Sequence, residues 1–314
     1  MEKKYRAGLI GVGSIAHIAH LPILAARNDV EMAGAFAEHI GSVQLTQKSY
    51  AIQHAVHNMD ELLSLGLDCA FVLSPKTVHA EQVIRLLEAG VDVFCEKPMG
   101  MTLKEAYDMA DASARTSRKL MIAFNRRYAP VYRKAKEIYG QISPDVLIAQ
   151  KNRPASEYRA TLENAIHMVD ILRYFCGECI KVEACSKFTD PLYETLTTAQ
   201  LQFENGSVAM LVANRASGQW VETLEMHGHN KSVLVNCPDS ITVTDAEQSH
   251  TTSMTPLAYG WAKVIDKMGF TQEVDHFFDC LAHDKEPLTN GADAYKTQEL
   301  MHRILTAAGL PGLE

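Results

Sequence analysis

The chain has 314 residues, of which 47% are hydrophobic and 22% are charged, a balance typical of a globular protein long enough for two cores. The formal net charge of −8 and the lack of any basic run argue against a surface that binds nucleic acid. Apolar stretches are too short to cross a bilayer, so we expect a small-molecule partner rather than nucleic acid or a membrane.

The first predicted elements are a strand, a glycine-rich turn and a helix. Residues 6–10 form a short apolar strand, and the helix that follows reaches residue 27. Between them, Gly11-Val12-Gly13-Ser14-Ile15-Ala16 has the G-x-G-x-x-A spacing that lets backbone amides approach a pyrophosphate at a helix N-terminus. We therefore expect Gly11, Gly13, Ser14 and Ile15 to contact a dinucleotide. The residues before the strand show no secretory signal pattern, which favours a cytoplasmic protein.

The second predicted strand covers residues 30–36, and an acidic residue at the end of this strand commonly binds the ribose hydroxyls of NAD. Ala37 occupies that position here, and Glu38 follows one residue later. Two interpretations stay open: Glu38 binds the ribose from a shifted position, or it is a solvated loop carboxylate. No arginine follows that would favour a 2′-phosphate, so the sequence predicts NAD(P) without choosing between NAD and NADP.

Strands and helices alternate as far as about residue 123. Further strands are predicted at 67–73, 91–95 and 120–124, and a helix is predicted at 59–63. Another helix begins after Thr102, which forms a capping box with Glu105. This alternation predicts an α/β fold with a doubly wound parallel sheet of the Rossmann type, in a dinucleotide-binding domain at residues 1–123.

A lysine follows the predicted strand at 91–95, in the tripeptide Glu96-Lys97-Pro98. Ligands of open parallel sheets bind at the carboxyl ends of the strands. Because a residue before proline avoids the helical region, we expect Lys97 to lie in an extended, stiff loop at this end of the sheet. The tripeptide alone does not distinguish two positions for Lys97. The side chain points into a ligand crevice, or it is exposed on the loop.

The pattern changes after residue 123, and Asn125 is expected to line the cleft at the end of the last strand of the first domain. Beyond it, strands follow one another, and Asn205-Gly206 has the composition of a hairpin turn. Successive hairpins predict a mainly antiparallel, open sheet in a second α/β domain at residues 124–314. The predicted elements are helices at 131–139, 161–176, 271–283 and 292–308, and strands at 145–149, 181–186, 195–203, 207–213, 221–227, 231–235 and 241–244.

The predicted helix at 161–176 is the most informative part of the second domain. At about 100° per residue, Glu163, His167, Asp170 and Tyr174 fall on one stripe, and apolar side chains occupy the other face. Two interpretations stay open. The row is a polar surface, or His167 is a structural residue held between carboxylates. Alternatively, a neighbouring carboxylate fixes the tautomer of His167 and raises its pKa, which suits the ring to proton transfer. Arg153 and Tyr158 precede the helix, and each is either a substrate contact or a surface residue.

Seven cysteines are scattered along the chain, and this odd number predicts free thiols in a reducing, cytoplasmic compartment. Cys176 and Cys179 form a single CxxC pair. A structural zinc site of this kind requires a second pair at a suitable spacing, and the sequence has none, so we expect no metal.

Five short motifs resemble those of the Gfo/Idh/MocA oxidoreductase family in their order and spacing. They are Gly11-Val12-Gly13, Ser74-Pro75 with His79, Glu96-Lys97-Pro98, Asn125-Arg126-Arg127-Tyr128 with Pro130, and His167-x-x-Asp170. The resemblance covers essentially the whole chain and is greatest to the MviM-like branch of predicted dehydrogenases. It implies a Rossmann domain, NAD(P), a sugar or polyol substrate, and an α/β domain whose open sheet faces a partner subunit in a homodimer or homotetramer.

The resemblance also implies roles for individual residues. In inositol dehydrogenase-like members, the lysine of the Glu-Lys-Pro motif acts with an acid and a histidine four residues apart, and these positions are Lys97, Glu163 and His167 here. The usual acid is aspartate, so Glu163 departs from the pattern by one methylene. Asp170 matches an acid that contacts a substrate hydroxyl. The positions that match the cofactor site are Ser74, Pro75, His79, Glu96, Lys97, Asn125 and Arg126, and Ala37 stands where the ribose-binding acid falls; His79 equally fits a capping or packing role.

These observations lead to one main hypothesis and two alternatives. The main hypothesis is hydride transfer between nicotinamide and a secondary alcohol or carbonyl carbon of a sugar-like substrate. In it His167 is the base, Glu163 orients it, and Lys97 bonds the reacting oxygen. The missing acid at Ala37 motivates the first alternative, a non-catalytic nucleotide-dependent regulator or sensor on the same scaffold. The second alternative is an enzyme that processes a glycoside with bound NAD.

Overall fold

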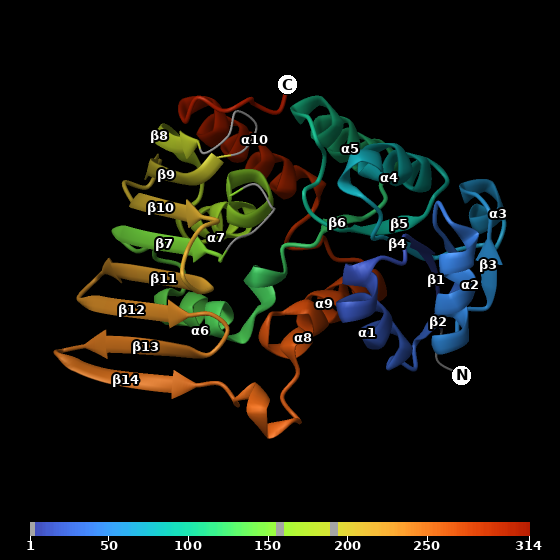
Figure 1. The fold of residues 1–314 in the computed structure, drawn as a ribbon, viewed down its shortest axis with the longest axis horizontal. Coiled ribbons are helices and arrows are strands. Elements are labelled where there is room, and N and C mark those ends of the chain that lie inside the picture. The colour runs from blue at the N-terminus through green and yellow to red at the C-terminus, as the bar shows by residue number, and fades with distance from the viewer. Residues whose placement is uncertain (1–3, 155–159, 189–193) are drawn as a thin grey trace. The chain divides into compact units, whose positions relative to one another are not determined.

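The computed structural model describes residues 4–154, 160–188 and 194–314. By their contacts these residues form two compact units. The first unit takes its residues from Met1–Ala123 and Phe270–Gln298, together with Glu314, and the second unit takes them from Phe124–Gly269 and Glu299–Leu313. In Figure 1 the N-terminal part of the first unit is blue to teal, and the segment that returns to it is orange to red.

The second domain predicted from the sequence ran without interruption from residue 124 to the end, whereas the contacts place residues 270–298 in the first unit. The reason is the burial of aromatic surface. On α9 (Phe270–His283), the ring of Phe277 packs 5.7 Å from Phe71 and 5.6 Å from Phe94, between ring centroids. The order of strands and helices along the sequence does not reveal that a later segment packs onto the first unit, because the contact joins residues that are far apart in sequence.

The first unit contains a six-stranded sheet of order β3-β2-β1-β4-β5-β6, in which the paired strands are parallel. Its strands are β1 (Tyr5–Ile10), β2 (Val30–Phe36), β3 (His54–Val56), β4 (Cys69–Val72), β5 (Asp92–Cys95) and β6 (Leu120–Ile122). This sheet confirms the predicted Rossmann architecture. Strand order reverses between β1 and β4, so the loops after these strands lie at the switch point where ligands of such sheets bind.

Helices connect these strands. They are η1 (Ala16–His20), α1 (Leu21–Ala25), α2 (Ile40–Ser49), α3 (Met59–Leu63), η2 (Lys76–Val78), α4 (His79–Glu88) and α5 (Leu103–Thr116). The Thr102 hydroxyl accepts the Glu105 N–H at 3.0 Å, and the Glu105 carboxylate accepts the Thr102 N–H at 3.2 Å. This reciprocal pair satisfies two N–H groups at the start of α5 and confirms the predicted capping box.

The second unit contains an eight-stranded sheet of order β14-β13-β12-β11-β7-β10-β9-β8. Its strands are β7 (Val146–Asn152), β8 (Cys179–Phe188), β9 (Glu194–Phe203), β10 (Val208–Asn214), β11 (Val221–Gly228), β12 (Lys231–Asn236), β13 (Ser240–Asp245) and β14 (Gln248–Ser253). Strands β7 and β10 are parallel and the other neighbouring pairs are antiparallel, which confirms the predicted mainly antiparallel sheet. Strand β14 is not predicted by the sequence, because its residues are polar and exposed and so lack an apolar alternation.

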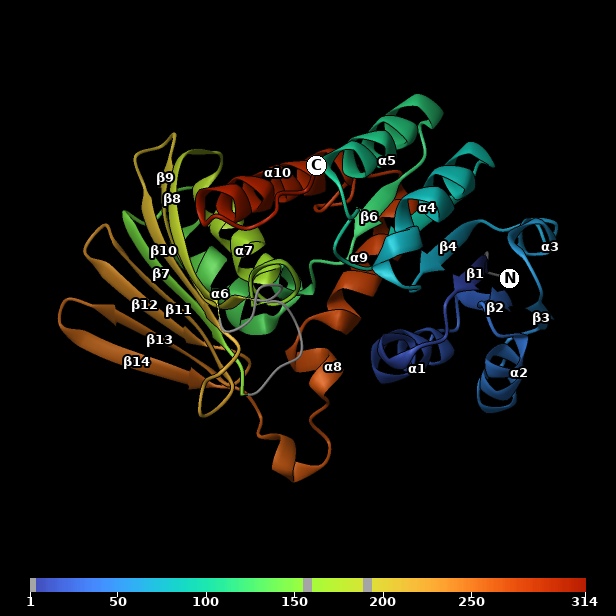
Figure 2. The same cartoon turned by 45° about the horizontal axis from the view of Figure 1, so that its top comes forward.

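Helices α6 (Pro130–Tyr139) and α7 (Ile166–Cys176) lie against one face of this sheet, as Figure 2 shows. No helix of the described residues covers the opposite face. Side chains of β7 alternate accordingly, because Leu147 and Ala149 are buried while Ile148 between them is partly exposed. The remaining helical elements are η3 (Asn125–Tyr128), η4 (Ala160–Ala165), η5 (Leu257–Tyr259), α8 (Val264–Lys267) and α10 (Gly291–Ala307). Among the described helices, none combines the length and the apolar character needed to cross a membrane.

Candidate active site

A tight turn after β1 forms the candidate dinucleotide site. Gly11 has a left-handed φ of +90°, and a Cβ there would lie 2.6 Å from the backbone nitrogen of Ser74. At Gly13, by contrast, a Cβ would meet none of the described atoms within 4 Å, and Gly13 and Ser14 are exposed. The chain becomes helical at Ser14, one residue before Ile15. Open space beside exposed residues at the start of a helix fits a pyrophosphate.

The loop after β2 lies next to this turn, since the Gly11 N–H donates to the Phe36 carbonyl at 2.8 Å. Ala37 is half-buried there, and Glu38 is exposed. Both interpretations of Glu38, a shifted ribose contact and a solvated carboxylate, agree with this position. Its role stays a prediction.

His79 joins the loops that follow β4 and β5. The side chain is buried, with Nε2 3.0 Å from the Ser74 carbonyl oxygen and Nδ1 2.9 Å from the Pro98 carbonyl oxygen. Burial lowers the pKa of His79, against the effect of the two carbonyl groups, so the ring is neutral at neutral pH and donates to one carbonyl at a time. This bridge agrees with a packing role, and the predicted cofactor contacts of His79, Ser74 and the exposed Pro75 stay predictions.

Lys97 is the second residue after β5 and is half-buried. Its backbone N–H donates to Glu96 Oε2 at 3.2 Å, and its peptide bond to Pro98 is cis. Glu96 is buried, and its other carboxylate oxygen contacts His20, which the sequence favours as a packing or surface residue of the first helix. The first unit therefore groups the glycine turn, the loop after β4 and Lys97 at the carboxyl ends of its central strands.

The second unit holds Glu163 and His167 on successive helical turns. Glu163 is half-buried in the π-helical segment η4, and His167 is the second residue of α7 and is buried. The sequence predicted one regular helix at 161–176. Because a π-helix forms i→i+5 hydrogen bonds, η4 changes the angular spacing of its side chains, and the stripe drawn for an α-helix does not continue through it.

Asp170 has no exposed surface and forms a bidentate ion pair with Arg127, at 2.8 Å to Nε and 2.6 Å to Nη2. Arg127 belongs to η3 and lies over the ring of Tyr174, 5.2 Å from its centroid. Helix α7 is thus buried on nearly every side, and within the row that the sequence predicted to face polar groups, Asp170 meets a guanidinium group. The ion pair gives Asp170 a structural role, and its predicted contact with a substrate hydroxyl stays a prediction.

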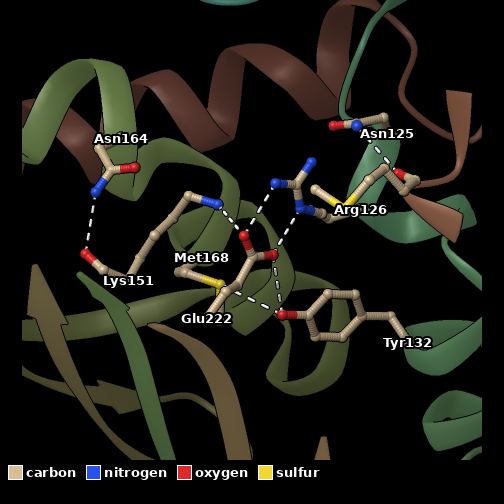
Figure 3. Close-up of polar contacts among 8 residues, drawn as sticks. Asn125, Arg126, Tyr132, Lys151, Asn164, Met168 and Glu222 are labelled. Atoms are coloured by element: carbon tan, nitrogen blue, oxygen red, sulfur yellow. Dashed lines mark hydrogen bonds and ion pairs between the residues drawn. The ribbon is translucent and has the colours of Figure 1, made fainter. Parts of the chain in front are cut away.

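A fully buried charge cluster lies near α7 in the second unit (Figure 3). The Glu222 carboxylate accepts hydrogen bonds from Arg126 Nε at 2.6 Å and Nη2 at 2.9 Å, from Lys151 Nζ, and from the Tyr132 hydroxyl at 3.3 Å. Glu222 on β11 and Lys151 on β7 stand directly opposite each other in the sheet. The Tyr132 hydroxyl also lies 3.6 Å from the Met168 sulfur, so the cluster reaches α7.

Two cations share one carboxylate in this cluster. Burial acts to raise the pKa of Glu222, but the charges of Arg126 and Lys151 outweigh it and hold that pKa well below the usual range. Burial and the charge of Arg126 lower the pKa of Lys151 to about 7, against the opposing charge of Glu222. The bidentate pair of Arg126 and Glu222 therefore keeps its charges at neutral pH, and Lys151 is the member that titrates there.

Asn125 and Arg126, two of the predicted cofactor contacts, are both buried in the second unit. The Asn125 side-chain amide donates to the Met268 carbonyl at 3.0 Å, and Arg126 pairs with Glu222. These contacts give both residues structural roles. Their predicted contacts with the cofactor stay predictions.

Lys151 and Glu222 escaped the sequence analysis, although the sequence contains a signal for them. Lys151 continues the buried alternation of β7 two residues after Ala149, and Glu222 precedes the buried Leu224 by two residues on β11. A charge that continues a buried alternation needs a partner inside the protein. Two such charges of opposite sign indicate an ion pair, but only the strand register shows that they face each other.

Arg153, a predicted substrate contact, is half-buried, with its guanidinium 4.1 Å from the centroid of the Trp220 ring. Tyr158 lies outside the described residues. The role of both residues stays a prediction. In the parts of the chain that the structure describes, no group of three or more His, Cys, Asp or Glu side chains is arranged to hold a metal ion.

Lys97 belongs to the first unit, whereas Glu163 and His167 belong to the second. Their joint action on one substrate therefore stays a prediction.

Two models of one protein family match the chain. Residues 5–124 match the model described as an oxidoreductase family with an NAD-binding Rossmann fold, a range that contains all six strands of the first sheet. Residues 152–309 match the model described as the C-terminal alpha/beta domain of an oxidoreductase family, a range that contains β8 to β14. The two descriptions agree with the architecture of the two sheets.

Individual relatives extend over nearly the whole chain. The uncharacterized oxidoreductase YrbE of Bacillus subtilis is 26% identical over 326 residues, which covers 93% of this chain and 91% of YrbE. The scyllo-inositol 2-dehydrogenase (NAD(+)) of the same species is 20% identical over 319 residues, which covers 94% of this chain and 91% of that protein. The crystal structure of a dehydrogenase (MviM) from Clostridium difficile has a TM-score of 0.88 and 24% identity, and covers 97% of this chain and 100% of that chain. This last likeness concerns the fold.

Proposed function

This chain belongs to the Gfo/Idh/MocA oxidoreductase family, and from that premise we propose that it transfers a hydride between NAD(P) and a secondary alcohol or carbonyl carbon of a sugar, polyol or related small molecule. A relative that is similar over nearly its whole length is named for the oxidation of an inositol with NAD(+), which supports a polyol-like substrate. The observation that carries the proposal is the position of Lys97. It follows β5 in the sheet whose Gly11–Gly13 turn has the open space and exposed helix start that a pyrophosphate requires.

The proposed chemistry consists of a hydride transfer and a proton transfer. When bound, the nicotinamide would accept the hydride during oxidation of the substrate and return it during reduction. Lys97 would donate a hydrogen bond from its ammonium group to the reacting oxygen and stabilise the negative charge that develops there. His167 would take up the hydroxyl proton on a ring nitrogen, and the Glu163 carboxylate would orient that ring and stabilise the imidazolium.

Other residues would hold the cofactor and the helix. Gly11, Gly13, Ser14 and Ile15 would bind the pyrophosphate. The exposed Glu38 carboxylate would accept hydrogen bonds from ribose hydroxyls and repel a 2′-phosphate, so we expect NAD to bind more tightly than NADP. The ion pair of Arg127 and Asp170 would hold α7 in place, which fixes the backbone that carries His167 three residues before Asp170.

Ligand binding and turnover test this proposal. We expect NAD to raise the apparent melting temperature of the purified protein, because a ligand that binds only the folded state stabilises it by mass action. In a panel of inositols, aldoses and glucosides, we expect at least one compound to be oxidised, with growth of the near-ultraviolet absorbance of reduced nicotinamide.

Each alternative has its own result in the same experiment. Stabilisation by NAD without turnover of any panel member would favour the regulator. Release of an aglycone from a glucoside without net reduction of the cofactor would favour glycoside processing. Failure of both NAD and NADP to bind would contradict the proposal.

The open face of the eight-stranded sheet supports a further part of the proposal, a homodimer or homotetramer formed through this face. Met210 is 51% exposed and Leu234 is 44% exposed. The register places Met210, Ile148, Glu225 and Leu234 in one row across β10, β7, β11 and β12. Exposed apolar side chains on an uncovered sheet face are typical of a surface that meets another subunit. All seven cysteines are free thiols, which supports a cytoplasmic location.

Substitution of Met210→Asp together with Leu234→Asp is expected to dissociate the oligomer, because two buried carboxylates without partners oppose association. Multi-angle light scattering measures the mass of the wild-type chain and of the variant. Lys134→Asp on the exposed side of α6 serves as the matched control and should leave the mass unchanged. A monomeric wild type, or a double variant with the wild-type mass, would contradict the proposed interface.

A further inference from the structure

A buried histidine lies behind the lysine that we propose to be catalytic. His20, the last residue of η1, has no exposed surface, and its Nε2 lies 2.9 Å from Glu96 Oε1. The other oxygen of the same carboxylate accepts the backbone N–H of Lys97 at 3.2 Å. One carboxylate therefore joins the first helical segment to the backbone of Lys97, although His20 and Glu96 are 76 residues apart.

Aromatic rings lie around His20, and within the part of the chain that the structure describes, the contact with Glu96 is the one hydrogen bond of its ring. The ring of Phe94 lies 5.3 Å away in an edge arrangement, and the rings of Phe270 and Phe71 lie 6.0 Å and 6.2 Å away, measured between centroids. Nδ1 of His20 is buried and has no hydrogen-bond partner among the described residues. Because a carboxylate only accepts hydrogen bonds, Nε2 is the donor to Glu96. The aromatic cage thus aims a single N–H at Glu96.

This contact keeps Glu96 ionised. Burial acts to raise the pKa of Glu96, but the hydrogen bond and charge of His20, the charge of Lys97 and the Lys97 N–H together hold it below the ordinary value. The other titratable groups that face Glu96 are neutral at neutral pH, since burial raises the pKa of the Cys95 thiol and lowers the pKa of His79. The carboxylate in turn favours the charged form of Lys97 through the same Coulomb attraction.

We propose that His20 is a positioning residue, which acts through Glu96 to hold Lys97 in place and to keep it charged. The inference rests on the proposed function in one respect: the catalytic value of a fixed, charged Lys97 depends on Lys97 acting on the substrate. The coupling of His20, Glu96 and Lys97 is a separate physical statement about the first unit, and it has a readout of its own.

Two substitutions at His20 separate the N–H from the bulk of the ring. His20→Gln places an amide donor near the position of Nε2, whereas His20→Phe fills the aromatic cage without a donor. We expect His20→Phe to raise the pKa of Glu96, so that kcat falls about tenfold or more at the acid end of a pH series and recovers as pH rises and Glu96 ionises. His20→Gln should keep most of the wild-type kcat and its pH profile. A merely structural defect would lower kcat by the same factor at every pH.

Lys97 itself supplies a readout that does not depend on turnover. Acetic anhydride acetylates a lysine only through its neutral amine. The rate of trace labelling therefore reports how strongly Lys97 is held in its charged form. Labelling is carried out over a pH series, and the peptides are quantified by mass spectrometry. His20→Phe should speed labelling of Lys97 about two- to tenfold at the acid end of the series, since one pKa unit is tenfold. Glu96→Gln removes the carboxylate charge directly and should speed labelling at every pH. Lys104, whose side chain is 80% exposed on α5, is the internal control in each digest.

The outcomes are distinguishable. Unchanged Lys97 labelling and an unchanged kcat profile in folded His20→Phe would overturn the inference. If His20→Phe does not fold, Glu96→Gln decides, and wild-type labelling of Lys97 in that variant would overturn it. If the wild-type chain turns over no panel compound, the proposed function fails, and the labelling series alone decides whether His20 and Glu96 control Lys97.

Discussion

Replacement of His167 by alanine is expected to lower kcat by about a hundredfold or more, and replacement of Lys97 by alanine is expected to do the same. His167 is the proposed acceptor of the hydroxyl proton, and Lys97 is the proposed donor to the reacting oxygen. Both side chains are proposed to act in the transition state, so kcat should fall by a larger factor than the affinity for NAD. Steady-state kinetics with the best compound of the panel, at saturating cofactor, measures them.

Matched substitutions in the same units separate this effect from a loss of folding. Lys104→Ala on α5 and His250→Ala on β14 change exposed residues of the same types and should keep the wild-type kcat. Thermal unfolding of each variant checks that the fold is intact. Normal turnover in a folded chain that lacks both the Lys97 and the His167 side chains would end this assignment.

Replacement of Glu222 by glutamine is expected to lower the free energy of unfolding of the second unit by about 3–5 kcal/mol, because it leaves the charged Arg126 guanidinium buried without a counter-charge. Urea unfolding followed by tryptophan fluorescence measures this unit alone. The chain has two tryptophans, Trp220 and Trp261, and both belong to the second unit.

Two further variants make the stability test specific for the buried cluster. Glu137→Gln changes the same residue type in the same unit, at an exposed position on α6, and should alter the free energy of unfolding by no more than about 0.5 kcal/mol. The double variant Glu222→Gln, Lys151→Met removes the buried Lys151 amine, which repels Arg126 whenever it is protonated, and should recover part of the loss. A folded Glu222→Gln variant with wild-type stability would show that the cluster does not stabilise the unit.

Much of the fold was predictable because its signals are local. The alternation of strands and helices predicted the parallel sheet, the Asn205-Gly206 turn predicted the hairpin between β9 and β10, and Thr102 marked the start of α5. Each of these signals lies within a few residues of the feature that it predicts. Two features were missed for the complementary reason: β14 has no apolar alternation, and the π-helical segment η4 has no sequence pattern that distinguishes it from an α-helix.

The candidate site was predictable as a set of residues but not as a set of contacts. Ordered motifs identified Lys97, His167 and Asp170. The sequence did not show that Asp170 is paired with Arg127 or that Glu96 is paired with His20. Asp170, which was expected to contact a substrate hydroxyl, and His20, which was expected to pack or lie on the surface, both belong to buried pairs.

By itself, the sequence determined the α/β class, the dinucleotide turn and the family, because propensities, glycine spacing and motif order are properties of neighbouring residues. Tertiary structure alone decided which charges meet: Arg127 with Asp170 at a separation of 43 residues, His20 with Glu96 at 76, and Arg126 with Glu222 at 96. The physical reason is that a buried charge needs an opposite charge nearby, and strand register and packing decide which residue supplies it. No local rule specifies that register.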